Sequence, residues 1–180
     1  EVGRDTRSFA NALKGALRED PDVIVIGELR DPETTSLAMT AAETGHLVIG
    51  TMSTSSAHKT IDRIIDSFPP EQQNQVRAML ADSIKGIVTQ RLIRNREGKR
   101  RVLAAEILVG TTPIASIIRD NKTFQLPSMI QTGKKVGMQL MDESLMRLVK
   151  EGSITPEAAY SNAANKKTFQ PLLKGAPPAK

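Results

Sequence analysis

The sequence is most informative at first for what it lacks. Its 180 residues contain no cysteine, which excludes disulfides and thiolate metal sites and fits a reducing compartment. With no tryptophan, one tyrosine and four phenylalanines, the core has to be built from aliphatic side chains. No apolar run approaches the roughly 18 residues of a membrane span, and no charged and then apolar leader opens the chain. We therefore expect a cytoplasmic protein.

Charge is unevenly distributed along the chain. Residues 1–90 carry 9 basic and 13 acidic side chains, a net of −4, whereas residues 91–180 carry 16 and 7, a net of +9. The densest basic run, residues 94–101, surrounds Gly98 and is most simply a solvated hairpin tip. A binding patch for an acidic partner is the alternative. The run contains no aromatic residue that would stack on bases, so we expect no nucleic-acid partner.

The chain is organised around a short apolar run at residues 23–26. Four consecutive, mostly β-branched residues favour a strand buried on both faces. Gly27 then allows a close bend of the backbone, and Glu28 follows at the carboxyl end of the strand. Asp31 and Pro32 are typical of an N-cap and the first residue of a helix.

Helix and strand patterns alternate in the first third of the chain. The spacing of apolar residues predicts helices at 9–17 and 32–44 and strands at 23–26 and 47–52. This order is typical of a parallel α/β sheet, in which ligands bind at the carboxyl ends of the strands. The hydroxyl-rich residues 53–56 follow the second strand, and they either cap the next helix or face the same crevice as Glu28.

The rest of the chain reads as helices interrupted by one pair of strands. A stripe of Ile61, Ile64, Ile65 and Phe68 predicts a helix, and the same period continues from Val76 to Ile87. Residues 87–93 and 102–109 predict antiparallel strands joined by the basic tip. Further predicted segments are helices at 113–119, 126–132, 139–150 and 155–164, and a loose tail at 168–180.

Several side chains at the predicted strand ends are candidates for chemistry. Glu28 is either a base that polarises a water attacking a terminal phosphate or a rim carboxylate paired with Arg30. Thr51 and Ser53 either hydrogen-bond a phosphate or cap a helix, and His46 either caps the preceding helix or senses a ligand. The chain contains no Gly-x-x-x-x-Gly-Lys-Ser/Thr loop, so it has no phosphate cradle of its own.

These residues also carry a resemblance that covers about residues 1–160. The matching segments are EVGRDT (1–6), DPDVIVIGELRD (20–31), AAETGHL (41–47), GTMST (50–54) and IDRI (61–64). Together they resemble the ATPases of type II secretion and type IV pilus systems, most closely the branch that retracts type IV pili in twitching motility. The tetracysteine insert of many assembly members is missing, which favours the retraction branch.

The resemblance implies a fold and a set of site residues. It implies a partial RecA-like parallel α/β sheet with flanking helices at 1–110, a small helical subdomain at 111–167 and a flexible tail at 168–180. Residues 23–31 match the Walker B segment, with Glu28 at the position of the catalytic glutamate. Residues 44–54 match the histidine box, which makes His46 and Ser53 candidate catalytic residues. Gly27, Thr51 and Arg30 become candidate nucleotide contacts.

The resemblance also implies cofactors and partners. We expect ATP, with Mg²⁺ held through waters near Glu28, a homohexameric ring, related pilus ATPases and an inner-membrane platform protein as partners. The phosphate loop of the family would lie upstream of Glu1, so the chain alone should bind nucleotide weakly or not at all.

Two departures separate this sequence from the family pattern. A histidine normally occupies the position of Ser53, and serine has neither its reach nor its positive charge. In the retraction motif at 113–120, Ile114, Ile118 and Arg119 agree, whereas Pro113, Ala115 and Ser116 do not. The expected function is the C-terminal portion of a pilus retraction ATPase. The alternative is a non-catalytic ring or docking subunit.

Overall fold

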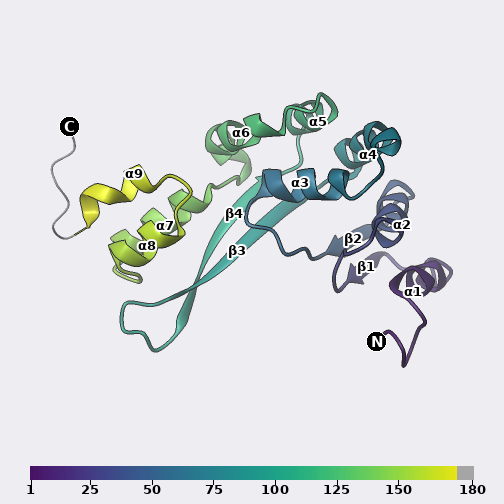
Figure 1. Ribbon diagram of the computed structural model, residues 1–180, viewed down its shortest axis with the longest axis horizontal. Helices are drawn as coiled ribbons and strands as arrows, with labels where there is room; N and C mark the ends of the chain where they lie inside the picture. Colours follow the sequence, from purple (N-terminus) through teal and green to yellow (C-terminus); the bar gives the residue numbers. More distant parts are fainter. Residues whose placement is uncertain (174–180) are drawn as a thin grey trace. The chain divides into compact units, whose positions relative to one another are not determined.

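The structure is a computed structural model that describes residues 1–173, and the remainder of the expected tail, 174–180, lies outside the described residues (Figure 1). The helices and strands are α1 (Phe9–Ala16), β1 (Val23–Ile26), α2 (Pro32–Glu43), β2 (Leu47–Gly50), α3 (Ala57–Asp66), α4 (Pro70–Ser83), β3 (Gly86–Arg94), β4 (Arg101–Val109), α5 (Thr112–Arg119), α6 (Leu126–Thr132), α7 (Met141–Lys150), α8 (Pro156–Asn162) and α9 (Lys166–Phe169). Short 3₁₀ turns are η1 (Thr123–Gln125), η2 (Gly133–Val136) and η3 (Gln170–Leu172).

Local capping explains why the first two helices begin where the sequence predicts. The Ser8 side chain accepts a hydrogen bond from the Asn11 amide at the start of α1. Asp31 does the same for α2: its carboxylate accepts from the Thr34 amide and from the Thr34 hydroxyl, both at 2.8 Å. Pro32 occupies the first helical turn of α2, where its missing N–H costs nothing. The predicted N-cap is confirmed.

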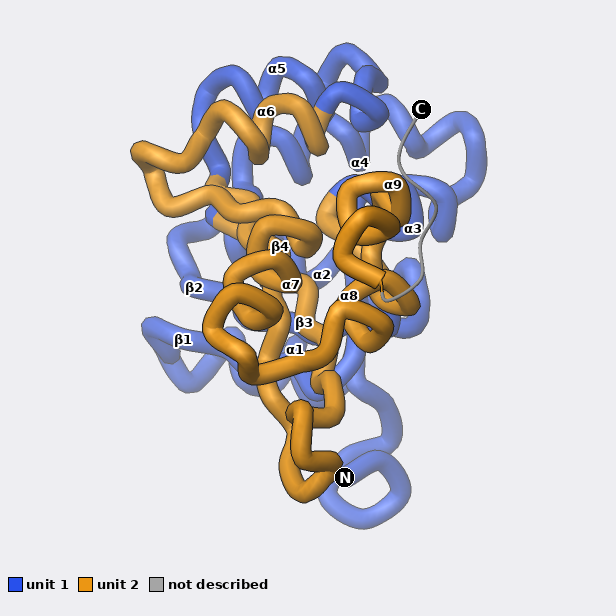
Figure 2. Tube along the Cα trace, turned by 90° about the vertical axis from the view of Figure 1, so that its left-hand side faces the viewer, with its two compact units in different colours: residues 1–54, 58–85, 110–125 blue, residues 55–57, 86–109, 126–180 orange. Residues whose placement is uncertain are grey.

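The described chain forms two compact units, each made of segments that are separate in the sequence (Figure 2). The first unit contains residues 1–54, 58–85 and 110–125, and the second contains residues 55–57, 86–109 and 126–180. This division differs from the domain boundaries expected from the sequence. The hairpin of β3 and β4 groups with the C-terminal helices, and α5 groups with the N-terminal helices.

The first unit contains the parallel pair predicted from the alternation of helices and strands. β1 and β2 run parallel from Val23↔Leu47 to Ile26↔Gly50. Helices α1 and α2 supply apolar side chains to one face of this pair, in a core of Leu13, Ile24, Ile26, Ala38 and Ala41. The parallel α/β arrangement is therefore confirmed.

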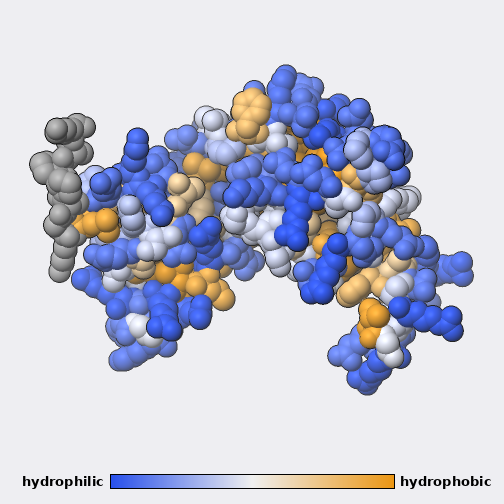
Figure 3. All heavy atoms as spheres, in the orientation of Figure 1, coloured by the Kyte–Doolittle hydropathy of each residue, from blue (hydrophilic) through white to orange (hydrophobic). Residues whose placement is uncertain are grey.

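The expectation that β1 is buried on both faces is wrong within the described residues. Its side chains alternate between exposed and buried: Val23 is 49% exposed and Val25 is 71% exposed. On the same sheet, Leu47 and Ile49 of β2 are each about half exposed. Residues 1–173 place helices against only one face of the pair, and apolar surface (orange) shows near the position of β1 and β2 in Figure 3.

The helices that follow β2 confirm the predicted apolar stripe and correct the next segment. Ile61, Ile64, Ile65 and Phe68 are all buried. The helical period assigned up to Ile87 is wrong at its end, because α4 ends at Ser83 and Ile87 is already paired in β3. Isoleucine at regular spacing occurs in helices and in strands, so the periodicity did not show that α4 ends at Ser83 and that β3 begins at Gly86.

The second unit is built on the predicted antiparallel hairpin. β3 and β4 pair in register from Gly86↔Val109 to Arg94↔Arg101, and Gly98 at the tip has the positive φ that the turn needs. The far edge of β4 is covered by side chains and backbone from outside the hairpin. Gln139 forms an antiparallel bridge with Ile107, and the Ser144 hydroxyl accepts from the Ala105 amide.

Phe169 contradicts the expected start of the loose tail. It is fully buried, and with α7 and α8 it closes a core of Ile93, Ala104, Met141, Leu145, Leu148, Ile154, Ala159 and Ala163. The carboxylate of Asp142 on α7 accepts from the amides of Ala164 and Asn165, which holds the start of α9. Residues 168–173 are therefore part of the second unit. The pattern missed them because a single phenylalanine shows no periodicity.

Over residues 1–173, none of the helices combines the length and apolar character needed to span a bilayer.

Candidate functional site

The carboxyl ends of β1 and β2 lie side by side in the first unit, and two hydrogen bonds join the loops that follow them. The Leu29 amide donates to the Thr51 carbonyl at 2.9 Å. The Thr51 hydroxyl donates to the carbonyl of Gly27. Because the strands are parallel, Glu28 and the Thr51–Thr54 segment leave the sheet at the same edge. The structure thus brings Gly27, Glu28 and Thr51 together.

Glu28 is paired with Arg30 at this edge. A carboxylate oxygen of Glu28 lies 2.5 Å from a guanidinium nitrogen of Arg30, and the Glu28 side chain is about one-third exposed. The hydrogen bond from Arg30 lowers the pKa of Glu28, partial burial opposes this, and the charges of Arg30 and Arg63 add to the lowering. The same pair raises the pKa of Arg30. Glu28 is therefore an ionised carboxylate at neutral pH.

This ion pair is what the second interpretation of Glu28 predicted, namely a carboxylate at the rim that pairs with Arg30. It is nevertheless compatible with a chemical function, because the Arg30 side chain is 72% exposed and has little to hold it in place. An exposed pair of this kind contributes little to stability. A ligand that competes for either partner can displace it at small cost.

Ser53 lies on the loop after β2, and Arg63 of α3 is the residue near it that sequence reasoning missed. A guanidinium nitrogen of Arg63 donates to the Ser53 carbonyl at 2.9 Å. The Ser53 hydroxyl itself makes no hydrogen bond within residues 1–173. Arg63 places a positive charge where it acts on Glu28. In the sequence, the only sign of this role was that Arg63 lies on the polar side of the helix that carries the apolar stripe. Many arginines that only face solvent occupy the same kind of position.

At this edge of the sheet Gly50, rather than Gly27, has a close neighbour. A Cβ on Gly50 would lie 2.8 Å from Cδ1 of Leu29, whereas nothing lies within 4 Å of one on Gly27. Leu29 therefore packs directly over the end of β2. The predicted close bend at Gly27 is not demanded by any neighbour in the described chain.

His46 is not brought together with the other candidates. It precedes β2, so the length of the strand, about 13 Å at the usual rise per residue, separates it from Thr51. Its Nδ1 lies 3.0 Å from the carbonyl of Ala41 and 3.3 Å from the hydroxyl of Thr44. Within this chain His46 caps the end of α2, which is the first of the two interpretations of this residue.

The residues at the strand ends fit a magnesium nucleotide better than a resident metal ion. In the described part of the chain, no three His, Cys, Asp or Glu side chains gather as a metal cluster. Mg²⁺ normally keeps several waters and binds through one or two carboxylates together with substrate phosphates. Glu28 supplies one carboxylate, and Thr51 and Ser53 supply hydroxyls on the facing loop.

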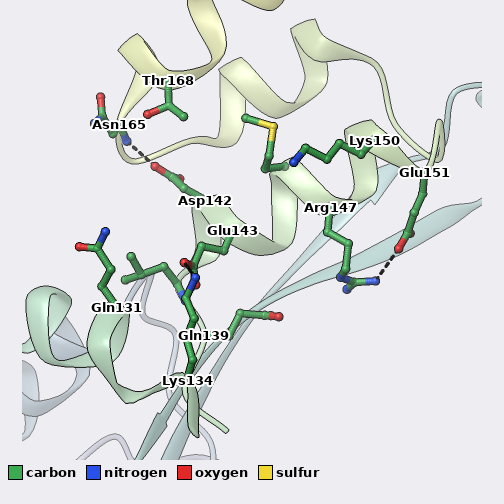
Figure 4. A pocket seen from close by; sticks show the side chains of 12 residues that line it. Gln131, Lys134, Gln139, Asp142, Glu143, Arg147, Lys150, Glu151, Asn165 and Thr168 are labelled. Carbon is green, nitrogen blue, oxygen red and sulfur yellow. Dashed lines mark hydrogen bonds and ion pairs between the residues drawn. The ribbon is translucent and has the colours of Figure 1, made fainter.

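A groove lies in the second unit and has a different character. It has a volume of about 880 Å³ and is lined mainly by α7 and the residues next to its two ends (Figure 4). Lys134 pairs with Glu143 and Arg147 pairs with Glu151 along it, at 2.6 and 3.2 Å. We place the candidate site at the strand ends rather than in this groove, because Lys134 and Arg147 of the groove are already paired with Glu143 and Glu151.

Comparison with known proteins places this geometry in a family. The domain of the type II/IV secretion system protein family matches residues 3–119. The chain is 51% identical over 169 residues to the twitching motility protein of Neisseria gonorrhoeae, covering 94% of this chain and 45% of that protein. It is also 51% identical over 169 residues to the type IV pilus retraction ATPase PilT of Pseudomonas aeruginosa, covering 94% of this chain and 49% of that protein.

A solved structure supports the same relationship. The crystal structure of the pilus retraction motor PilT with bound ADP superposes with a TM-score of 0.84 at 49% identity, over 93% of this chain and 47% of that one. The predicted α/β fold is therefore confirmed. The chain spans about half the length of the relatives it matches. On the family match and these identities, the chain belongs to the type II/IV secretion system protein family.

Proposed function

We propose that this chain is the C-terminal portion of an ATPase whose hydrolysis of ATP powers the retraction of type IV pili. The observation that carries the proposal is the position of Glu28, at the carboxyl end of β1 and beside the hydroxyl-bearing loop that follows β2. The names of the relatives support the direction of the motor, since one is a twitching motility protein and another a pilus retraction ATPase.

Glu28 is proposed as the base of the reaction. Its lowered pKa keeps the carboxylate ionised, so it is able to accept a proton from water as the water oxygen attacks the terminal phosphorus. The bond between the terminal phosphorus and the bridging oxygen breaks, its electron pair stays on that oxygen of ADP, and the terminal phosphorus leaves as inorganic phosphate. Thr51 and Ser53 are proposed to orient the water or the phosphate through their hydroxyls. His46 lies outside this group, at the end of α2, and it takes no part in the proposed step.

The nucleotide and its metal ion are proposed from the same residues. Glu28, Thr51 and Ser53 would face a magnesium nucleotide, and a bound Mg²⁺ would supply neutralisation of the charge that develops on the phosphates. The phosphate loop is proposed to come from residues outside this sequence. The PilT structure that this chain matches contains ADP, which supports a nucleotide as the ligand.

The partners follow from the proposed motor. We propose that the whole protein assembles as a homohexameric ring alongside related pilus ATPases and acts on a platform protein at the cytoplasmic face of the inner membrane. The exposed apolar face of β1 and β2 supports further burial in the whole protein.

Replacement of Glu28 by glutamine in the full-length protein tests the proposal. Glu28→Gln should lower ATP turnover by roughly 10²- to 10⁴-fold and leave ATP binding unchanged, because it removes the proton acceptor at constant volume. Glu33→Gln is a matched control, since Glu33 is an exposed acid on the first turn of α2 that pairs with Lys14. An unchanged turnover in Glu28→Gln would refute the assignment.

Ser53 supports a second candidate, a non-catalytic ring or docking subunit that assembles with active relatives. The hydroxyl of Ser53 makes no hydrogen bond within residues 1–173. The loop 51–56 also contains no histidine that could act instead of Ser53. Ser53→His in the full-length protein separates the two. A sharp rise in hydrolysis favours the non-catalytic subunit, and an unchanged, substantial rate favours the ATPase.

A further inference from the structure

The end of the β3–β4 hairpin gathers positive charge within the second unit (Figure 1). Residues 94–101 contain five cations and one acid, and every residue of this run except Asn95 is exposed. The acid is Glu97, whose carboxylate lies 3.7 Å from the ammonium of Lys99. Within residues 1–173, no carboxylate lies at ion-pair distance from the other four cations, which are Arg94, Arg96, Arg100 and Arg101. The described chain therefore leaves the charge of these four arginines without a counter-ion.

Two of the arginines face one another across the hairpin. Arg94 and Arg101 are the last register pair of β3 and β4, so their side chains leave the same face of the sheet. Like charges that lie directly opposite each other destabilise a pair of strands. Arg101 donates to the Leu92 carbonyl at 3.4 Å, and this neutral acceptor does not remove the repulsion. An anion bound between the two guanidinium groups would remove it.

The next register pair on the same face is apolar. Leu92 lies directly opposite Leu103, and the two residues are 60% and 47% exposed. The reverse face of the hairpin is the one that packs into the core of the second unit, through Ile93 and Ala104. Protein–protein interfaces typically have an apolar centre and a polar rim, and they are enriched in arginine. The two leucines beside the two arginines have this composition.

Backbone hydrogen bonds fix the shape of the hairpin end. The Asn95 amide donates to the Arg100 carbonyl at 2.8 Å, and the Asn95 side chain accepts from the Arg100 amide at 3.1 Å. The Gly98 amide donates to the Asn95 carbonyl at 2.9 Å. The Arg96 amide donates to the Ser153 carbonyl, in the loop after α7, also at 2.9 Å. An ordered backbone lowers the entropy cost of binding a partner of fixed shape, which favours a protein over a fluid lipid surface.

We propose that this face of the hairpin end docks an acidic segment of a partner protein. The docking surface consists of Arg94, Arg101, Leu92 and Leu103. Carboxylates of the segment bind the two arginines, because a planar guanidinium pairs with a carboxylate through two parallel hydrogen bonds. An apolar side chain of the segment packs on the two leucines. This inference goes beyond the proposed function and does not rest on it, since docking requires no ATP turnover.

A fluorescent acidic peptide tests the docking surface on the full-length protein. The probe has the order Glu-Glu-Leu-Glu-Glu-Leu-Glu-Glu, and fluorescence anisotropy measures its Kd. In Arg94→Gln/Arg101→Gln we expect Kd to rise by about 5- to 25-fold, the combined effect of two exposed ion pairs. Because salt screens such pairs, the Kd of the parent should rise with ionic strength more steeply than that of this variant.

The leucines are tested by Leu92→Thr/Leu103→Thr, which keeps side chains that suit a strand. Loss of their apolar surface should raise Kd by at least about threefold. The Tm of the full-length protein should stay within about 3 °C of the parent, because a free docking face has no packing to lose. A larger fall in Tm would show that the protein's own chain covers the two leucines, and would overturn the proposal.

Lys166→Gln/Lys167→Gln is the matched control for charge. It makes the same change in net charge at two exposed lysines of α9, in the same unit but outside the hairpin. Kd for the peptide should stay within about twofold of the parent. An equal rise in Kd in this control would overturn the proposal, since net charge rather than the hairpin would then decide binding.

Two further results would also overturn the docking surface. One is an unchanged Kd in Arg94→Gln/Arg101→Gln. The other is a parent that binds phosphatidylglycerol vesicles through Arg94 and Arg101 but does not bind the peptide, which would assign the same arginines to lipid phosphates.

Discussion

Phe169 offers a direct test of where the folded part of this chain ends. Its ring is fully buried against Met141, Leu145 and Leu148 of α7, although the segment from residue 168 onward reads as a loose tail. Truncation to alanine removes the transfer free energy of the ring and leaves a cavity in a closed core. Together these terms typically cost about 3–5 kcal/mol.

The matched control is Leu172, three residues beyond the end of α9. It is 41% exposed and belongs to no buried cluster among the described residues, so Leu172→Ala should cost less than about 1 kcal/mol. The two substitutions therefore differ by several kcal/mol if the structure is right. They should be equal and small if the segment is a tail.

Urea unfolding followed by tyrosine fluorescence measures the difference. Tyr160 is the only tyrosine in a chain without tryptophan, and it packs against the same core as Phe169, so its emission reports on the second unit. With an m-value of about 2 kcal/mol per molar urea, Phe169→Ala should lower the midpoint by about 1.5–2.5 M. A shift no larger than that of Leu172→Ala would refute the placement of Phe169.

Two further predictions concern the strand ends. Arg30→Ala should raise the pKa of Glu28 towards its ordinary value, because it removes the main hydrogen bond that lowers it, so the acid limb of the pH–turnover profile of the full-length protein should move to higher pH. An acid limb that stays in place would contradict this electrostatic account. Gly50→Ala should destabilise the fold by up to about 1 kcal/mol in thermal unfolding, since the Leu29 side chain has to move to admit its Cβ, whereas Gly27→Ala should have little effect. Equal shifts in Tm for the two glycine variants would show that Leu29 does not pack as described.

Local chemistry made much of the fold predictable. α6 lies at the predicted residues, and α2 begins at Pro32 because Asp31 caps it, a contact three residues away in sequence. The hairpin of β3 and β4 follows from two apolar runs and the positive φ of Gly98. Each of these features depends on side chains close together along the chain.

The parts that sequence reasoning missed depend on contacts between distant segments. The exposed face of β1 was not predictable from Val23 and Val25, since the same β-branched residues suit a covered or an open sheet. Glu106, whose carboxylate accepts a hydrogen bond from the Ala57 amide, gave no sign of this partner, because Ala57 is separated from it by 49 positions. Arg63 likewise resembles any solvated arginine until α3 is folded beside the loop after β2.

Sequence alone determined the alternation of helices and strands, and with it the edge of the sheet where Glu28 and Thr51 emerge, because periodicity, capping and parallel strands are properties of short stretches. Only the tertiary structure decided that Leu29 lies against Gly50 rather than Gly27, that His46 caps a helix away from that edge and that Phe169 closes the second core. Those outcomes depend on which distant side chains meet in space, and no local pattern of residues specifies that.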